Sequence, residues 1–392
     1  MIKKKLGVLI THPIQYYTPL FRYLAAQPSV DLTVYYCMKP DSHQQGGGFG
    51  VSFQWDIDLT SGYTHVWLKN KSSKPDLDSF YGCNTPEIKS IINEKKFDAF
   101  LVLGWAKKSM WQAMRACWQT RTPLLVRGDS HLHVDTGLVK RGVKDILYPY
   151  FMKKFDVCLA VGRWSAEYFE HYGAKRVIYS PHFVDNTFFE EKAAKARADR
   201  NTLRKAFNIP LDSVVFLFAG KFEEKKWPLD LLTAFKDLLE KNIKKGSVHA
   251  LMVGDGALKE ICETYVRENS LPVVFTGFLN QTKIPEAYAV SDVLVLPSDG
   301  RETWGLVVNE TMACGLPAIV SDQVGCGPDL VREGETGFIF PCRDTRALSD
   351  AMLKFFQIPN KTRLGENAKK HVMKYSVSQA ADGILKAMDR HL

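Results

Sequence analysis

Two glutamates, Glu302 and Glu310, stand eight residues apart in the stretch 298–315, the first on an expected loop and the second on the helix that follows. Gly305 has no side chain where this helix begins, so its amide and that of Leu306 can meet an anion, which the helix dipole also favours. One carboxylate could then bind sugar hydroxyls and the other ribose hydroxyls, with phosphates between them. Taken alone, the spacing is also typical of two solvated glutamates on a surface loop.

A lysine-rich loop offers the matching positive charge. Residues 220–228, Gly-Lys-Phe-Glu-Glu-Lys-Lys-Trp-Pro, follow an expected strand and open a helix at Pro228. Lys221 and Lys226 could neutralise a diphosphate leaving group as point charges. A lysine-rich loop by itself is more often a solvated turn. A further loop, residues 324–328, precedes a short expected helix and offers more helix-start amides.

The elements around the glutamates form one strand–helix–strand unit. Residues 293–297 are short, rich in Val and Leu, and end in Pro-Ser-Asp-Gly, which predicts a buried strand followed by a loop. The helix after Gly305 ends at Gly315, and a second strand follows at residues 318–321. Ligands of parallel sheets bind beyond the carboxyl ends of the strands, where Glu302 is expected.

The same alternation runs through both halves of the chain and predicts an α/β fold with parallel sheets and helices on both faces. The expected strands are residues 6–10, 31–36, 99–103, 124–127 and 157–160 in the first half, and 214–219, 250–253, 273–276, 293–296 and 318–321 in the second. Residues 190–208 are charged and rich in alanine, which favours a link between domains. We expect domains at residues 1–190 and 191–375, and a helix at 376–392 that could pack back on the first domain.

Composition places the chain among globular proteins. Its 392 residues are 45% hydrophobic and 24% charged, and no apolar run approaches the roughly 18 residues that span a bilayer. The start resembles a signal peptide, but its apolar part ends after five residues, so we interpret it as the first strand. Eight cysteines without a CxxC pair favour reduced thiols in a cytoplasmic protein over disulfides or a zinc site.

The net charge of +9 fits nucleic acid, an anionic membrane or a phosphorylated substrate, or solubility alone. Helix-turn-helix and zinc-finger motifs are missing, so we expect no nucleic-acid partner. Two stretches could instead rest on anionic lipid, although core packing is the commoner explanation for the tryptophans. They comprise Lys140, Arg141, Lys144, Tyr148, Tyr150, Phe151, Lys153 and Lys154, and the helical stripe Trp111, Met114 and Trp118.

The ordered set of motifs in the second half resembles the GT4 family of retaining glycosyltransferases, which have the GT-B fold. The resemblance is carried by Gly220-Lys221 to Lys226, residues 275–277, residues 291–298, Glu302-x₇-Glu310, residues 315–317, 325–329 and 335–337, and by residues 179–189 before them. Residues 11–19, 49–50, 55–56 and 62–63 resemble one branch of that family. The resemblance implies two Rossmann-like domains whose parallel sheets face a central cleft.

The resemblance also implies roles for individual residues. Lys221 and Lys226 would hold the donor diphosphate, the amides of Gly305 and Leu306 the distal phosphate, and Glu310 the ribose. Glu302 would contact the transferred sugar and face the reacting carbon.

Further donor contacts are implied for Thr303 and Trp304, and for the backbone near Phe278, which would meet the base. The sequence departs from the family at Lys221 in place of Arg, Trp227 in place of Gly and Asp329 in place of Glu.

The first half offers candidate acceptor residues. His12, Tyr16 and Tyr17 follow the first expected strand. His12 could contact the acceptor, act as general base in an inverting reaction, or bond a backbone group beside Pro13. Asp129 and His131 follow another strand and could touch the donor sugar or the acceptor as catalytic-site residues.

A long polar loop, residues 39–62, contains a glycine-rich run followed by Trp55 and Asp56. These residues could bind sugar, or the segment could be a surface loop.

The reaction implied by the resemblance transfers a sugar, with retention, from a UDP- or GDP-sugar to a hydroxyl of a glycan or lipid-linked acceptor. No metal or other cofactor is required in the family. We expect a role in cell-surface polysaccharide or glycolipid synthesis, in the cytoplasm or on the inner face of the plasma membrane. A sugar-nucleotide epimerase of the same fold and a catalytically silent partner subunit remain alternatives.

Overall fold

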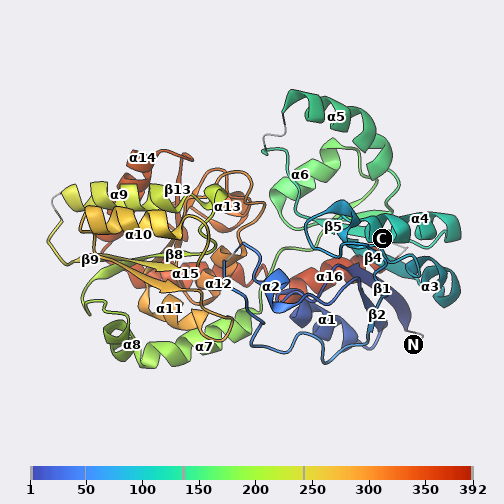
Figure 1. Cartoon of the computed structure of the whole chain (residues 1–392), viewed down its shortest axis with the longest axis horizontal. Coiled ribbons are helices and arrows are strands. Elements are labelled where there is room, and N and C mark those ends of the chain that lie inside the picture. Colours follow the sequence, from blue (N-terminus) through green and yellow to red (C-terminus); the bar gives the residue numbers. More distant parts are fainter. Residues whose placement is uncertain (1–2, 49, 135–136, 242, 390–392) are drawn as a thin grey trace. The chain divides into compact units, whose positions relative to one another are not determined.

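The computed structural model describes residues 3–48, 50–134, 137–241 and 243–389 (Figure 1). They divide into two compact units. The first comprises Met1–Gln45, Ile57–Phe183 and Ser376–Leu392, and the second comprises Gly46–Asp56 and Val184–Tyr375. The first unit therefore ends at Phe183 rather than at residue 190, and part of the long polar loop groups with the second unit.

The first unit is built on a seven-stranded parallel sheet in the order β3-β2-β1-β4-β5-β6-β7. Its strands are β1 (Lys4–Ile10), β2 (Val30–Tyr36), β3 (His65–Trp67), β4 (Ala99–Leu103), β5 (Leu124–Gly128), β6 (Val157–Ala160) and β7 (Val177–Tyr179). Most are continuous apolar runs, as expected for strands that helices cover on both faces. The strand order reverses between β1 and β4, which opens a ligand crevice at their carboxyl ends.

Two hydrophobic cores flank this sheet because successive strand residues point to opposite faces. Val8 of β1 lies in the core that includes Phe21 and Ile384, whereas Leu9 lies in the core that includes Ile92 and Met114. The helices are α1 (Tyr17–Ala25), α2 (Ser42–Gln45), α3 (Ile88–Lys95), α4 (Lys108–Thr120), α5 (Leu138–Met152), α6 (Arg163–His171) and α16 (Val377–Met388). The last of these, α16, packs against α1, β6 and β7.

The second unit repeats the pattern with six parallel strands in the order β10-β9-β8-β11-β12-β13. They are β8 (Val214–Ala219), β9 (Val248–Val253), β10 (Val273–Gly277), β11 (Val293–Leu296), β12 (Ala318–Ser321) and β13 (Gly337–Phe340). The helices are α7 (Asn186–Ala198), α8 (Arg200–Ala206), η2 (Glu224–Lys226), α9 (Pro228–Glu240), α10 (Lys259–Glu268), α11 (Ile284–Val290), α12 (Leu306–Ala313), α13 (Gly327–Leu330), α14 (Thr345–Gln357) and α15 (Lys361–Val372). The order reverses between β8 and β11.

The charged segment 190–208 lies in α7 and α8, which pack against α11 of the second unit. Arg200 and Arg204 of α8 bind the Asp292 carboxylate at 2.7 and 2.9 Å. Arg204 is 3% exposed and also donates to the carbonyl of Val290. These charges therefore build a partly buried network, where the composition had suggested a link.

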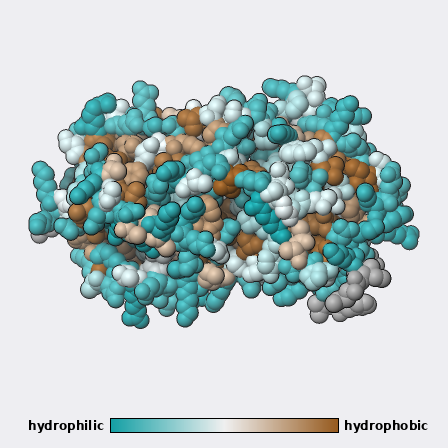
Figure 2. Space-filling model, turned by 90° about the horizontal axis from the view of Figure 1, so that it is seen from below, coloured by the Kyte–Doolittle hydropathy of each residue, from teal (hydrophilic) through white to brown (hydrophobic). Residues whose placement is uncertain are grey.

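The surface drawn in Figure 2 is mostly hydrophilic, with hydrophobic residues in small separate groups. Such scattered apolar residues are normal for a globular protein. No helix among the described residues has both the length and the apolar character needed to cross a membrane.

Candidate active site

Lys226 and Glu302 meet at the carboxyl ends of β8 and β11, the point where the strand order reverses. Lys226 closes η2 after β8, and Glu302 lies on the loop after β11. The Lys226 Nζ and a Glu302 carboxylate oxygen form an ion pair, with side chains 12% and 13% exposed. This pair lies at the position where the topology of a doubly wound sheet places ligands.

The backbone around Glu302 is held by the loop before α13. The Gly325 amide donates to the Glu302 carbonyl at 3.0 Å, and the Cys326 amide donates to the Trp304 carbonyl at 2.9 Å. A Cβ added to Gly325 would lie 1.9 Å from the Thr303 carbonyl oxygen, so any side chain there would push the two loops apart. The glycine thus lets two loops fix the position of Glu302.

Trp304 faces the protein interior. Its side chain is 4% exposed, and its Nε1 donates to Asn309 Oδ1 of α12 at 2.8 Å. The indole therefore anchors the loop to the helix.

Gly305 turns the chain into α12. Its φ of 96° lies in the left-handed region, which glycine adopts without steric strain. A Cβ at this position would lie 3.0 Å from Leu296 Cδ2 and 3.3 Å from Val324 Cγ1. The first amides of a helix have no partner within it, so the start of α12 presents donors and a positive dipole end to an anion.

Glu310 lies two-thirds of the way along α12, where it accepts a short hydrogen bond from the Tyr288 hydroxyl. Burial raises the pKa of Glu310 from 4.5 to about 7, and the Tyr288 bond and the Lys226 charge oppose that rise. Burial likewise raises the pKa of Tyr288 well above its usual range. Lys226 thus acts on both carboxylates: it pairs with Glu302 and lies within electrostatic range of Glu310.

Trp227, at the position where the GT4 family that the sequence resembles has glycine, has a positive φ of 47°. The residue is held in this conformation from two sides. Its Nε1 donates to Asp299 Oδ2 at 2.9 Å, and the Arg343 guanidinium stacks 3.3 Å from the ring centroid. The side chain provides anchors that a glycine would not have.

Segment 46–56 lies over the ends of β8, β9 and β10. The Lys221 Nζ donates to the Gly47 carbonyl at 2.6 Å, and the rings of Phe53 and Phe278 lie 4.3 Å apart. Further along, the Asn280 side chain donates to the Gln54 carbonyl at 2.7 Å. Phe49, within the branch motif, lies outside the described residues. The segment therefore touches two of the predicted donor residues, Lys221 and Phe278.

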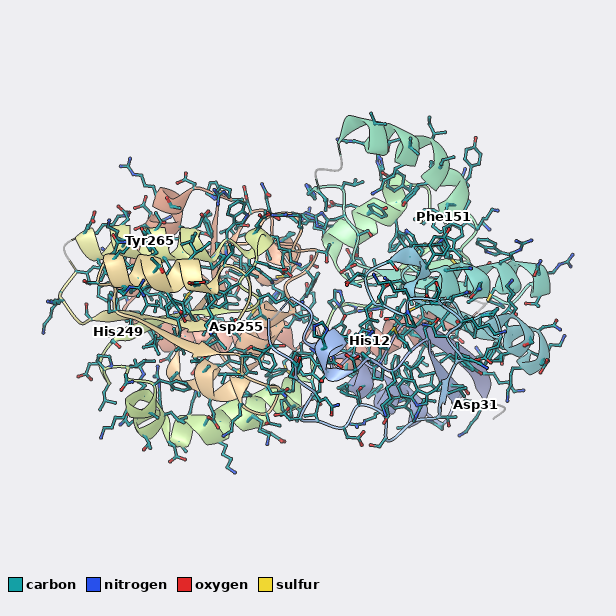
Figure 3. All side chains as sticks on the ribbon, viewed as in Figure 1. His12, Asp31, Phe151, His249, Asp255 and Tyr265 are labelled. Atoms are coloured by element: carbon teal, nitrogen blue, oxygen red, sulfur yellow. The ribbon has the colours of Figure 1, made fainter. Side chains whose placement is uncertain are left out.

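Two features of this site are missing from the sequence-based prediction. One is Tyr288, for which the sequence gives no signal beyond its place on a helix. The other is the turn Gly254-Asp255-Gly256 after β9 (Asp255 is labelled in Figure 3). A Cβ at Gly254 would lie 1.9 Å from the Gly220 carbonyl oxygen, so the turn packs directly on the Lys221 loop. A Gly-Asp-Gly sequence directly after a strand is the signal that could have identified it.

The candidate residues of the first unit form a separate group at the ends of β1, β5 and β7. His12 follows β1 (Figure 3), and its Nδ1 lies 2.9 Å from Thr11 Oγ1. Burial lowers the pKa of His12 from 6.5 to about 4. The imidazole is therefore neutral at pH 7 but a weak base.

Tyr16 and Tyr17 stand at the start of α1 with their rings 4.7 Å apart. Tyr17 is buried, and its hydroxyl accepts a 2.9 Å hydrogen bond from the buried Arg127. Burial raises the pKa of both tyrosines. Tyr17 thus acts in packing, and Tyr16 points its ring toward His182 at 6.2 Å.

Asp129 lies beside His182, a histidine that the sequence-based prediction overlooked. His182 Nε2 is 4.0 Å from Asp129 Oδ2, and burial lowers the pKa of His182 to about 4. His131 is 5% exposed, and its ring lies 5.3 Å from that of Trp164. Asp129, with its side chain 47% exposed, is the more accessible member of this group.

No group of three or more His, Cys, Asp or Glu side chains is placed to hold a metal ion within the described ranges. The residues predicted to bind the donor lie in the second unit, and those predicted to contact the acceptor lie in the first.

Comparison with known proteins gives a family for the second half and a fold for the whole chain. Residues 199–371 match the family model described as Glycosyl transferases group 1. N-acetyl-alpha-D-glucosaminyl L-malate synthase of Bacillus anthracis is 30% identical over 190 residues, which are 47% of this chain and 47% of that protein. The chain thus matches about half the length of this curated relative.

Solved structures resemble the chain over nearly its full length. A glycosyltransferase from Rickettsia africae ESF-5 has a TM-score of 0.74 at 15% identity, covering 98% of both chains. Anabaena Alr3699/HepE in complex with UDP has a TM-score of 0.69 at 17% identity, again covering 98% of both. The structural similarity establishes the fold, which is the GT-B fold with two parallel-sheet domains. At identities this low it shows the fold alone.

Proposed function

We propose that this GT-B chain is a retaining group 1 glycosyltransferase that uses a nucleoside-diphosphate sugar, since residues 199–371 match the model of that family. The observation that carries the proposal is the grouping of Lys226, Glu302 and Glu310 beside the start of α12. It combines a cation, helix amides and two carboxylates at the carboxyl ends of β8 and β11.

The donor is held by charge and by hydroxyl recognition. Lys221 and Lys226 bind the diphosphate, and the amides of Gly305 and Leu306 bind its distal phosphate. Glu310 accepts from the ribose hydroxyls. UDP-sugars are the first donors to test because the structurally similar Anabaena protein was solved with UDP, with GDP-sugars as the second choice.

The chemical step breaks the bond between the anomeric carbon and the diphosphate oxygen and forms a bond to the acceptor oxygen on the same face. The departing phosphate oxygen takes the acceptor proton, so no separate base is needed. Lys226 and the α12 amides stabilise the charge on the leaving group. Glu302 faces the anomeric carbon and stabilises its developing positive charge. The low pKa of His12, about 4, supports this route over base catalysis by histidine.

The acceptor is a hydroxyl of a glycan or of a lipid-linked sugar, bound in the first unit by His12, Tyr16, Asp129 and His131. We place the reaction in cell-surface polysaccharide or glycolipid synthesis, at the cytoplasmic face of a membrane and without a required metal. An epimerase would convert the sugar nucleotide into its epimer without an acceptor, and a silent partner subunit would not turn over donor.

Donor turnover by Lys226→Ala and Glu302→Ala tests the proposal, after thermal-shift screening of UDP- and GDP-sugars has identified a ligand. We expect each variant to lose about 100-fold or more in turnover, the range seen when a stabilising group is removed from the reacting centre. Lys225→Ala is the matched control, since Lys225 is the neighbouring lysine and pairs with Glu223 instead. Wild-type turnover in both test variants would contradict the proposal.

A further inference from the structure

Helix α5 presents a continuous apolar stripe to solvent. The exposed fractions are 82% for Val139, 51% for Val143, 67% for Ile146, 57% for Leu147 and 72% for Tyr150. At about 100° per residue these positions fall within an arc of roughly 100°, which is one face of the helix. A folded protein rarely exposes so many large apolar side chains side by side.

The opposite face of α5 anchors the helix to the first unit. Met152 is fully buried in the core of that unit, and Tyr148 and Phe151 pack against the same core. The Phe151 ring stacks on Trp111 at 5.0 Å (Phe151 is labelled in Figure 3). The exposed stripe is therefore displayed on a helix that is already packed.

This arrangement changes the composition of the predicted lipid-facing surface. Tyr148 and Phe151 point inward and Met114 is buried, so they do not form the surface. The apolar contact comes instead from the aliphatic residues and Tyr150 of α5. The side chain of Lys140, also part of the prediction, lies outside the described residues.

Positive charge borders the stripe. Lys144 lies on its flank, with its ammonium 5.6 Å from the Tyr148 ring, and Lys153 ends the helix. The helix contains one acidic residue, Asp145, which lies on another face and accepts from the Tyr172 hydroxyl at 3.2 Å. The charges around the stripe thus favour an anionic surface.

A cationic pocket adjoins the end of α5. It has a volume of about 440 Å³, and its charged lining consists of Arg121, Lys153, Lys154, Lys175 and Asp156. Lys154 also lies over the Trp118 ring, 4.9 Å from its centroid. Lys153, which caps α5, also lines the pocket, so this group of cations begins where the helix ends.

We infer that α5 docks the protein on an anionic lipid bilayer, with Val139, Val143, Ile146, Leu147 and Tyr150 in the acyl–headgroup boundary and the pocket cations at the lipid phosphates. An amphipathic helix of this kind lies in the plane of the interface and is helped by anionic lipid. A second copy of the chain is a poorer occupant, because a symmetric pair would bring the same cations face to face.

Vesicle co-sedimentation of the full chain tests the inference. The probes are vesicles of phosphatidylcholine alone and vesicles of phosphatidylcholine and phosphatidylglycerol in equal parts, each at low and high salt. We expect binding to the mixed vesicles that weakens in high salt. Ile146→Glu should reduce the partition coefficient by on the order of tenfold, since it removes the burial of one large apolar side chain and adds a repelled charge.

The matched control is Ile261→Glu, the same substitution at a 51% exposed isoleucine on α10 of the second unit. This variant should bind vesicles as the wild type does. Because Ile146 is exposed, Ile146→Glu should retain the wild-type melting temperature and the wild-type hydrolysis of a soluble donor. A failure of donor turnover alone would count against the proposed function, and a failure of vesicle binding alone against the docking.

Hydrogen exchange gives a second readout. Mixed vesicles should slow exchange in residues 138–152 and leave α10 unchanged. Equal sedimentation of Ile146→Glu and wild type would overturn the inference. So would sedimentation equilibrium showing that the wild type is a dimer that Ile146→Glu dissociates, since the stripe would then be an interface between copies.

Discussion

The ammonium group of Lys221 donates a 2.6 Å hydrogen bond to the carbonyl oxygen of Gly47. The ammonium has three N–H donors and segment 46–56 occupies one of them, so a donor diphosphate that binds Lys221 competes with the segment for this cation. The other end of the segment is fixed by Asp56, which accepts from the Thr282 amide at 3.2 Å and from its hydroxyl.

The first prediction concerns this competition. Asp56→Ala should release the segment and tighten UDP binding about threefold to tenfold, the equivalent of roughly one net hydrogen bond. Because the segment also packs on Phe278 through Phe53, uridine is the reference ligand: UDP should gain more affinity than uridine, and the difference isolates the diphosphate contact. Isothermal titration with both ligands measures the effect, and Asp58→Ala, two residues along, serves as the control. Weaker or unchanged UDP binding by Asp56→Ala would contradict the idea.

A second prediction follows from the raised pKa of Glu310, about 7 against a usual 4.5. Between these pH values the folded protein keeps a proton that the unfolded chain has lost, so this residue makes stability fall as the pH rises. Glu310→Gln removes that dependence. The variant should match the wild type near pH 5 and exceed it near pH 8 by on the order of 1 kcal/mol, because partial exposure reduces the burial penalty.

Melting temperatures recorded across this pH range, without ligand, provide the measurement. Tyr288→Phe removes a bond that lowers the Glu310 pKa, so it should move the transition to higher pH. Parallel profiles for wild type and Glu310→Gln would show that Glu310 does not titrate in this range.

The third prediction concerns the strained backbone of Trp227. Trp227→Gly relieves a left-handed conformation, worth about 1 kcal/mol, but loses the Asp299 hydrogen bond and the Arg343 stacking, worth about 2–3 kcal/mol together. The net result should be destabilisation in denaturant unfolding. Lys96→Gly is the control: Lys96 has φ 54° at the end of α3, and glycine there should stabilise the protein. Equal gains in both variants would show that the Trp227 anchors contribute little.

The fourth prediction distinguishes two possible roles of His12, contact with the acceptor and general-base catalysis. A histidine with a pKa of about 4 is a weak base, so His12→Asn should lower turnover by less than about tenfold. Loss of a true general base would lower it by about 100-fold or more. Initial rates with the donor found by screening decide between them, and Thr11→Val controls for the hydrogen bond between Thr11 and the ring.

Most strands were predictable because their residues are apolar on both faces, whereas the short strands β3, β7 and β13 were not predicted. Residues 99–103, 157–160 and 318–321 form strands with the predicted bounds, as expected where helices cover both sides of a sheet. The loops that carry Glu302 and Lys226 were recognisable for a related reason: a polar run directly after a buried strand must lie at the carboxyl end of that strand.

Other features depend on pairings that no local pattern encodes. Lys226 meets Glu302 because β8 neighbours β11 in the sheet, although β9, β10 and the helices η2, α9, α10 and α11 lie between the two strands in the chain. Segment 190–208 has a polar composition, yet Arg204 is buried because Asp292 and several carbonyls receive its donors. The outward stripe of α5 has the periodicity of a core-facing helix, and sequence alone cannot tell which side the rest of the protein covers.

The assignment of residues 46–56 to the second unit has a consequence for dissecting the protein. The backbone passes between the units four times, after Gln45, Asp56, Phe183 and Tyr375. No single cut yields two complete units. Cleavage after Phe183 gives an amino-terminal fragment without α16 and a carboxyl-terminal fragment without segment 46–56, which accepts the hydrogen bond from Lys221. Reconstituting the second unit in isolation therefore requires adding residues 46–56 as a separate peptide.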